Sequence, residues 1–342
     1  MKKLLSIILL VGLSSISYAG GVNSASDGNH NHASSAKASS GVHFYGRLYI
    51  GYDSTSGDVQ KLDDGGNKSR LGLKIRSGNI IGNLEYKFDI GDGTSGAGNN
   101  CGTNNENGCQ TFDMHIGNLG FITPLGYIGG GTYEAPYKTM GQFDTNRDTA
   151  IALNSHGGFS QGQGGIAGNF EGAIAYHAMM GPLEIEAMYA ASKGSNDVAN
   201  TDRGDYSVGI TAKDMFMNGL TFGFARYQDA ENSTISEKND KVFASFKAMP
   251  NMGIFVSLED LEVVNTFIAS SGTDGRISTY GIHYSMGMTD LQFVLADGDS
   301  SAAAANQDYS TSSISAKINL SKNSDITIGY TKQDFDADGS DV

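Results

Sequence analysis

The chain has 342 residues, a formal net charge of −14, 39% hydrophobic residues, 47 glycines and only 4 prolines. Beyond its amino-terminal end, no stretch approaches the ~20 consecutive apolar residues that a membrane helix needs, which excludes a helical membrane protein. The strong acidity argues against nucleic acid as a partner, because phosphates are bound by basic surfaces.

The amino terminus has the order of a secretory signal peptide. Lys2 and Lys3 precede an apolar stretch from Leu4 to Leu13, and small and polar residues then end at Ala19. This order predicts a signal peptide over residues 1–19, with cleavage after Ala19. A membrane anchor is the alternative, but the apolar stretch is short for a span.

A segment of low complexity follows over residues 20–41. It consists mainly of Gly, Ser, Ala and Asn, and it contains His30 and His32. Such a composition predicts a disordered amino-terminal segment on the periplasmic side. The two histidines are possible metal ligands, although a flexible polar tail is the expected state.

From residue 42 to residue 342 the chain alternates apolar and polar residues over many short segments. In one of them, Ile326, Ile328 and Tyr330 alternate with Thr327, Gly329 and Thr331. A period of two indicates strands with one apolar and one polar face. In an exported chain, the pattern predicts an all-β fold, a transmembrane antiparallel up-and-down β-barrel of about 16 strands.

Short and long connections alternate along this region. Tight turns are expected at 78–79, 123–126, 179–182, 249–252, 287–288 and 321–324. Long polar loops are expected near 54–68, 92–110, 134–163, 193–203, 230–238, 263–275 and 298–308. Outer-membrane barrels are built in this way, with short turns in the periplasm and long loops outside the cell.

The count of strands is about fifteen, whereas bacterial barrels normally have an even number. The last predicted strand, near 325–335, runs into the acidic stretch from Asp334 to Val342. We therefore expect either that a final strand is missing from this sequence or that the count is off by one at the amino terminus.

Two short patterns invite chemical interpretations. Cys101 and Cys109 lie in a polar stretch and are expected to form a disulfide in an oxidising compartment. Asp334, Asp336 and Asp338 match the first half of a calcium-binding loop, but the distal Glu of that loop is absent, which favours a solvated acidic loop. No pattern predicts a cofactor. Ser155 and His156 are residue types found in hydrolase sites, but no nucleophile motif or orienting acid accompanies them, so no catalytic site is predicted.

Several motifs in sequence order resemble the trimeric general porins of Gram-negative outer membranes. Residues 44–48 (FYGRL) are similar to the first strand of that family, and residues 69–74 (SRLGLK) are similar to its second strand. Residues 131–137 (GTYEAPY) resemble the stretch that leads into the constriction loop, and the hairpin around 173–183 resembles the one that follows it.

The resemblance implies a homotrimer of barrels with about sixteen strands, in which a loop at about 134–163 folds into the lumen and narrows it. Where the family has basic residues, this chain has Thr132, and further such positions correspond to Phe112 and Asn169. The family's terminal aromatic residue is also absent, since the sequence ends with Val342.

Strand parity assigns the charged side chains to the lumen, because a charge facing lipid at mid-depth costs roughly 2–4 kcal/mol. The positions expected to line the pore and its constriction are Arg47, Arg70, Lys74, Arg76, Asp144, Arg147 and Asp148. Basic and acidic walls that face each other would set a transverse field across the channel. The alternative is that these charged residues pair with one another in salt bridges that stabilise the barrel and do not act on solutes.

These features predict an outer-membrane channel for the passive diffusion of ions and small hydrophilic solutes. Its expected partners are outer-membrane lipid and lipopolysaccharide, two further copies of the chain, and the permeating solutes. An adhesin or structural surface protein with long ligand-binding loops is the alternative. A barrel enzyme such as a lipase is a third hypothesis, and no motif supports it.

Overall fold

The structure is a computed structural model, and it describes residues 12–14, 40–54, 61–63, 69–88, 112–146, 149, 151–153, 156–159, 169–190, 204–232, 235–262, 275–300, 308–321 and 323–335. Within these residues, no helix is long and apolar enough to cross a membrane. The predicted disulfide partners, Cys101 and Cys109, lie outside the described residues.

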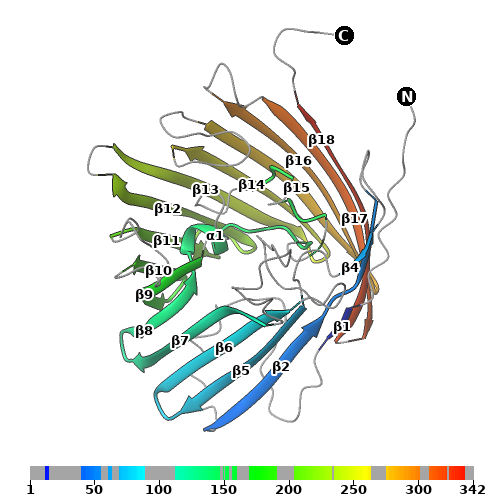
Figure 1. Ribbon diagram of the computed structural model, residues 1–342. Helices are drawn as coiled ribbons and strands as arrows, with labels where there is room; N and C mark the ends of the chain where they lie inside the picture. Colours follow the sequence, from blue (N-terminus) through cyan, green and yellow to red (C-terminus); the bar gives the residue numbers. More distant parts are fainter. Residues whose placement is uncertain are drawn as a thin grey trace, which may run out of the picture.

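Fifteen long strands form one antiparallel up-and-down sheet that curves into a barrel, in which strands adjacent along the sheet are hydrogen-bonded (Figure 1). They are β2 (Gly41–Leu48), β5 (Ser69–Ser77), β6 (Ile80–Phe88), β7 (Asp113–Thr123), β8 (Gly126–Glu134), β9 (Asn169–Met180), β10 (Leu183–Ala190), β11 (Tyr206–Lys213), β12 (Leu220–Asn232), β13 (Ile235–Met249), β14 (Met252–Leu261), β15 (Gly275–Met286), β16 (Thr289–Ser300), β17 (Tyr309–Ser321) and β18 (Ser324–Phe335). Strands β3 (Gly51–Asp53) and β4 (Lys61–Asp63) form a separate two-stranded sheet. The predicted all-β fold and its antiparallel topology are confirmed.

Among the described residues, the first and last long strands, β2 and β18, are joined through the short strand β1 (Gly12–Ser14). In β1, Leu13 pairs with Ser324 on one side and with Leu48 on the other. The ring thus contains sixteen strands only when β1 is counted. β1 lies within the predicted signal peptide, so cleavage after Ala19 would remove the strand that joins β2 and β18. The predicted missing final strand would pair at the same place. Both the cleavage and the missing strand stay predictions.

The short connections lie where the sequence places them. Strands β5 and β6, β7 and β8, β9 and β10, β13 and β14, β15 and β16, and β17 and β18 are each joined by a two-residue turn. The expected long loop at 230–238 is wrong, because β12 and β13 extend into it and pair up to Asn232 and Ile235. Polar composition there indicated a loop, but the cross-strand pairing continues past an irregularity in the register.

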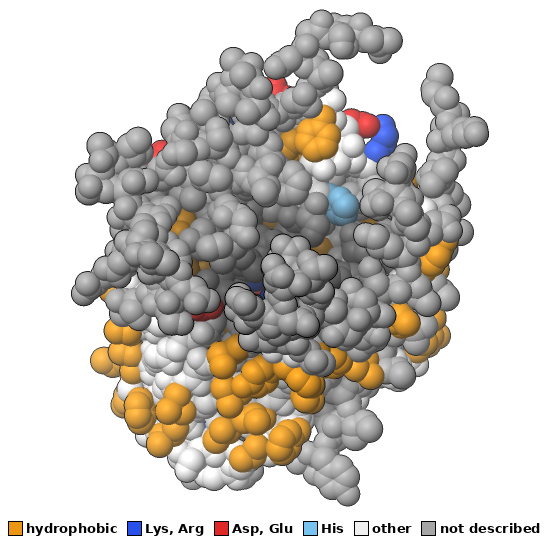
Figure 2. All heavy atoms as spheres, in the orientation of Figure 1, with side chains coloured by type: hydrophobic (Ala, Val, Ile, Leu, Met, Phe, Trp, Pro, Cys, Tyr) orange, Lys and Arg blue, Asp and Glu red, His pale blue; other side chains and the backbone are white. Residues whose placement is uncertain are grey.

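The two faces of the strands differ as the period of two predicts. Large apolar side chains such as Phe44, Leu119 and Phe293 are exposed on the convex face. Side chains of the opposite parity, such as Lys241, Ser257 and Thr279, are buried on the concave face. Figure 2 shows apolar side chains gathered over the lower part of the molecule, where β5 to β8 lie in Figure 1. This apolar exterior is the surface that meets lipid.

Arg226 on β12 is a charged residue on the same face as Phe222 and Phe224. It pairs with Asp240 of β13, with Nε 2.5 Å from Oδ1 and a second nitrogen 2.7 Å from Oδ2. The two residues are direct cross-strand partners near the β12–β13 hairpin. A bidentate ion pair between neighbouring strands therefore accounts for this charge on the outer face.

A lysine on the outer face is expected to destabilise the barrel, whereas one on the inner face is not. Phe44→Lys places an ammonium group where the side chain is 67% exposed toward lipid, and should cost about 2–4 kcal/mol. The matched control, His43→Lys, changes the neighbouring residue of opposite parity and should have little effect. Urea titrations of both variants in lipid vesicles test this. Equal losses of stability would contradict the assignment of faces.

Candidate functional site: the interior of the barrel

The connection between β8 and β9 enters the barrel and lies against its inner wall. It begins with the single-turn helix α1 (Pro136–Thr139), which Figure 1 shows inside the curved sheet. Proline fits the first position of a helix because its missing N–H would have no partner there. We call the described part of this connection, from Ala135 to Phe159, the inner loop.

The first attachment of the inner loop is a buried cluster of polar groups around Tyr137. Its hydroxyl donates to Glu259 Oε2 at 2.6 Å, and its backbone N–H donates to Ser207 Oγ at 3.0 Å. Lys241 Nζ donates to the Tyr137 carbonyl at 2.8 Å and lies 3.7 Å from Glu259 Oε1. Lys241 and Glu259 have fully buried side chains, so this ion pair is tied to the loop in a water-poor environment.

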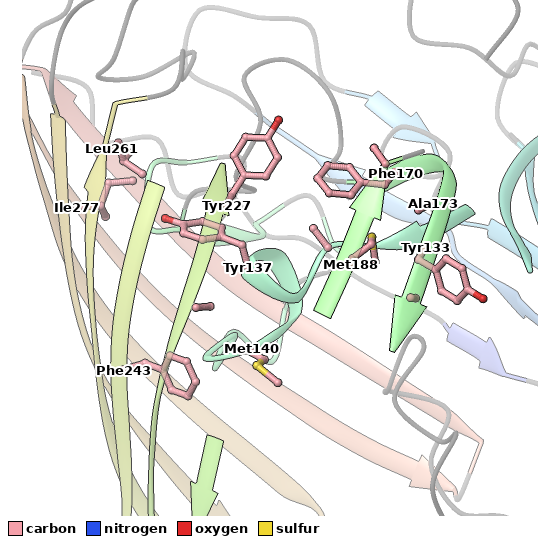
Figure 3. Packing of buried hydrophobic residues seen from close by; sticks show 14 of the residues in the cluster. Tyr133, Tyr137, Met140, Phe170, Ala173, Met188, Tyr227, Phe243, Leu261 and Ile277 are labelled. Carbon is pink, nitrogen blue, oxygen red and sulfur yellow. The ribbon is translucent and has the colours of Figure 1, made fainter. Parts of the chain in front are cut away.

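Apolar packing surrounds this polar cluster. Figure 3 shows Tyr137 and Met140 of the inner loop among side chains of the wall, including Tyr227 and Phe243. Gly209 makes room for Met140, because a Cβ atom at that position would lie 2.3 Å from the methionine Sδ. The loop is thus held by a small hydrophobic core inside the barrel as well as by hydrogen bonds.

The second attachment lies around Asn146. Its side-chain amide donates to Gln292 Oε1 at 2.9 Å and to Ser315 Oγ at 2.8 Å, which joins the loop to β16 and β17. Thr145 Oγ1 also donates to Gln292 Oε1, at 2.5 Å. Polar side chains at concave positions of two neighbouring strands thus bind one turn of the loop.

The third attachment uses backbone carbonyl groups of the loop. The His156 carbonyl accepts from Thr311 Oγ1 at 2.6 Å, and the Gly157 carbonyl accepts from the Tyr309 hydroxyl at 2.7 Å. The Gly158 carbonyl accepts from the Thr279 hydroxyl. The three attachments involve strands from β11 to β17, which form one side of the ring.

The basic residues singled out in the sequence lie on the other side of the ring. Arg47 belongs to β2, whereas Arg70, Lys74 and Arg76 belong to β5, and Arg47 and Arg70 are cross-strand partners. Arg70 Nε lies 3.6 Å from Glu85 Oε1, and Lys74 Nζ lies 5.2 Å from the centre of the Tyr45 ring. The structure therefore brings these four residues to two neighbouring strands.

Glu85 connects this basic region to β7. Its Oε1 lies 2.7 Å from His115 Nδ1, and its Oε2 accepts from the Tyr45 hydroxyl at 2.8 Å. The register between β6 and β7 shifts at this point, since Glu85 pairs with Ile116 and the next residue, Tyr86, pairs with Met114. His115 is the extra residue of this irregularity, and strand parity alone therefore does not indicate its contact with Glu85.

Asp144, which the sequence assigns to an acidic wall, is buried and serves the inner loop itself. Its Oδ1 accepts from the Asn146 N–H at 2.8 Å, and its Oδ2 accepts from the Leu153 N–H at 2.7 Å. Both carboxylate oxygens thus fix the conformation of the loop. Arg147 and Asp148 lie outside the described residues.

The weak calcium motif at the carboxyl end lies mostly beyond the described part. Asp334 is described and pairs with Lys332 on β18, whereas Asp336 and Asp338 are outside the described residues. The structure therefore does not test this motif.

Sequence reasoning missed the groups that hold the inner loop and the cluster around Glu85. Lys241 and Glu259 are charged residues at concave positions of their strands, so parity placed them inside. Nothing in the sequence indicated that the two would meet Tyr137, because they lie 104 and 122 residues away from it.

The family model of the Gram-negative porins matches residues 31–338. The chain belongs to the Gram-negative porin family. It is therefore an outer-membrane channel for the passive diffusion of ions and small hydrophilic solutes, as the sequence predicted. The comparison with curated proteins found no match.

Solved porin structures share the fold. An anion-selective porin from Comamonas acidovorans matches with a TM-score of 0.57 at 14% identity, over 86% of this chain and all of that one. The trimer form of OmpT from Vibrio cholerae has a TM-score of 0.58 at 14% identity, with 88% and 92% covered. OmpF of Salmonella typhi, in a complex with daunomycin, has a TM-score of 0.54 at 10% identity, with 96% and 97% covered. Membership of a porin family indicates a channel rather than an enzyme.

Breaking one side of the buried ion pair should destabilise the channel more than removing both charges. Lys241→Met leaves Glu259 without its ammonium partner and should cost about 3–5 kcal/mol. The double variant Lys241→Met/Glu259→Gln leaves neither charge of the pair and keeps an acceptor for the Tyr137 hydroxyl, so its loss should be smaller. Urea unfolding midpoints of the two variants provide the comparison. A double variant that is less stable than the single one would show that the unpaired carboxylate is not the source of the loss.

Proposed function

We propose that the chain works as a homotrimeric diffusion pore whose aperture is set by the inner loop, with solutes passing between this loop and the wall of β2 and β5. The observation that carries the proposal is the threefold attachment of the loop to the inner face of the strands from β11 to β17. A segment held by a buried ion pair and buried hydrogen bonds is a fixed partition rather than a mobile flap. Fixed partitions give a channel a constant size limit.

The basic residues are proposed to set the electrostatic character of this passage. Arg47, Arg70, Lys74 and Arg76 share two adjacent strands, so their charges lie in one region of the lumen, where Glu85 offsets part of the charge of Arg70. Both oxygens of Asp144 accept hydrogen bonds from the backbone of the inner loop. The carboxylate therefore faces the loop itself, and we do not assign it to an acidic wall of the passage. We therefore place the dominant field on the basic wall and expect it to favour anions locally, against the overall negative charge of the chain.

Assembly as a homotrimer is supported by the likeness to the trimer form of OmpT from Vibrio cholerae. Three channels of equal size in one particle produce conductance steps in groups of three.

Reconstitution into planar bilayers tests the pore and its constriction. The wild type should give stable current steps in triplets, and replacement of residues 142–158 by a short Gly-Ser linker should raise the conductance of each step. Shortening the connection 263–274 between β14 and β15 is the control and should leave the step size unchanged. Equal conductance with and without residues 142–158 would show that the inner loop does not narrow the channel. A folded protein that carries no current would instead favour the surface-binding alternative.

Neutralising part of the basic wall should shift ion selectivity. Lys74→Gln/Arg76→Gln removes two positive charges from the lumen, so the cation-to-anion permeability ratio should rise by roughly twofold or more. Lys332→Gln, which changes an exposed lysine on β18, is the matched control. Reversal potentials under a salt gradient give the ratio. An unchanged or lower ratio in the double variant would show that these residues do not shape the field.

A further inference from the structure

Three side chains that can bind a metal ion meet on the inner wall, on β9 and β10, away from the basic residues of β2 and β5. His177 of β9 is the direct cross-strand partner of Glu186 of β10, and Glu184 lies two residues from Glu186 on the same face. His177 Nε2 is 3.1 Å from Glu184 Oε1 and 3.8 Å from Glu186 Oε1. One ligand atom from each residue lies within 4.8 Å of the other two.

These separations match the requirements of a shared metal ion. Zinc binds imidazole nitrogen and carboxylate oxygen at about 2.0–2.2 Å, so two ligands of one tetrahedral ion lie roughly 3.4 Å apart. The two measured distances from His177 fall on either side of this value. These two separations therefore need only small side-chain adjustments for one shared ion, and the separation between the two carboxylates lies within 4.8 Å.

The surroundings also fit an ion. His177 and Glu186 are only 6% and 8% exposed, and both line a cavity of about 30 Å³ that is bounded by Tyr133, Glu134 and Met188. This volume holds a water-sized occupant. The second ring nitrogen of His177, Nδ1, is buried and has no hydrogen-bond partner among the described residues. With Nε2 on the ion, Nδ1 carries the proton and needs a water molecule or another acceptor outside the coordination sphere.

Lys213 supports this arrangement instead of blocking it. Its Nζ lies 2.7 Å from Glu184 Oε2, whereas the other oxygen of the same carboxylate, Oε1, is the one that faces His177. A ligand carboxylate whose second oxygen accepts a hydrogen bond is oriented by that bond, as is usual around metal sites.

We propose that His177, Glu184 and Glu186 form a binding site for a divalent transition-metal ion of the zinc type, inside the lumen near the end that carries the short turns. The imidazole favours zinc over calcium and magnesium, which prefer ligand sets made of oxygen atoms alone. The site lies a few residues before the β9–β10 turn, and Glu134 and Pro136 line the same cavity. It thus lies beside the residues from which the inner loop departs.

The test is a calorimetric titration of the folded full-length protein with ZnCl₂ after treatment with EDTA and its removal. His30 and His32 are a second possible source of zinc ligands, so the titration is made in a His30→Ala/His32→Ala background. We expect one zinc per chain in this background. Adding His177→Ala or Glu186→Gln should weaken zinc binding at least tenfold, whereas His43→Ala, a histidine elsewhere in the lumen, should leave it unchanged. The readout needs no ion flux and is therefore independent of the pore proposal.

Three results would overturn the site. One is loss of all zinc binding in the His30→Ala/His32→Ala protein, which would assign the metal to the amino-terminal segment. Another is unchanged affinity in both His177→Ala and Glu186→Gln, which would leave the cluster as an internal hydrogen-bonded group. The third is equal affinity for Ca²⁺ and Zn²⁺, which would exclude the imidazole as a ligand. Because Glu186→Gln keeps the size and hydrogen-bonding capacity of the side chain, it remains informative if His177→Ala fails to fold.

Discussion

Backbone hydrogen bonding in lipid is the constraint on which the rest of this structure depends. The hydrocarbon core offers no water to an unpaired N–H or C=O group, so each strand inside it must have a partner on both sides. From β5 to β17 the sheet meets this requirement with antiparallel neighbours. Only the meeting of β2 and β18 relies on the three-residue strand β1. Because the paired strands are extended, their side chains alternate between lipid and lumen. The connections between strands must lie outside the hydrocarbon core, either at the two ends of the barrel or in its interior.

The concave face of this barrel differs from the buried face of a sheet in a soluble protein. In a soluble protein the buried face of a sheet packs on a continuous apolar core, but here the concave face carries hydroxyl, amide and charged groups. The inner loop uses them as hydrogen-bonding partners and adds a small apolar core around Tyr137 and Met140. One side of the ring is thereby committed to holding the loop. The other side, with β2 and β5, presents arginine and lysine side chains, and the proposed pore mechanism depends on this difference between the two sides.

Regular periodicity made much of the fold predictable. The tight turns, the number of long strands from residue 42 onward and the lipid-facing side chains follow from local sequence, because the chain must alternate strictly to meet lipid on one face. Prediction failed where the period was interrupted. Polar residues near 230–238 looked like a loop although the strands continue. At His115 a shift in register brings the histidine to Glu85, which parity does not indicate. Arg226 lies on the apolar face to which parity assigns it, and its partner Asp240 was not predicted.

By itself, the sequence determined the class of the molecule: an exported, acidic, strand-rich chain with one apolar and one polar face, matching the Gram-negative porins. Its charges could be assigned to a face, since parity is a local property of each strand. The pairing of those charges was decided only by the tertiary structure. Arg70 meets Glu85, Lys241 meets Glu259 beneath the inner loop, and Asp144 binds its own loop. Register, bulges and the path of the loop set these contacts, and each depends on residues that are distant along the chain.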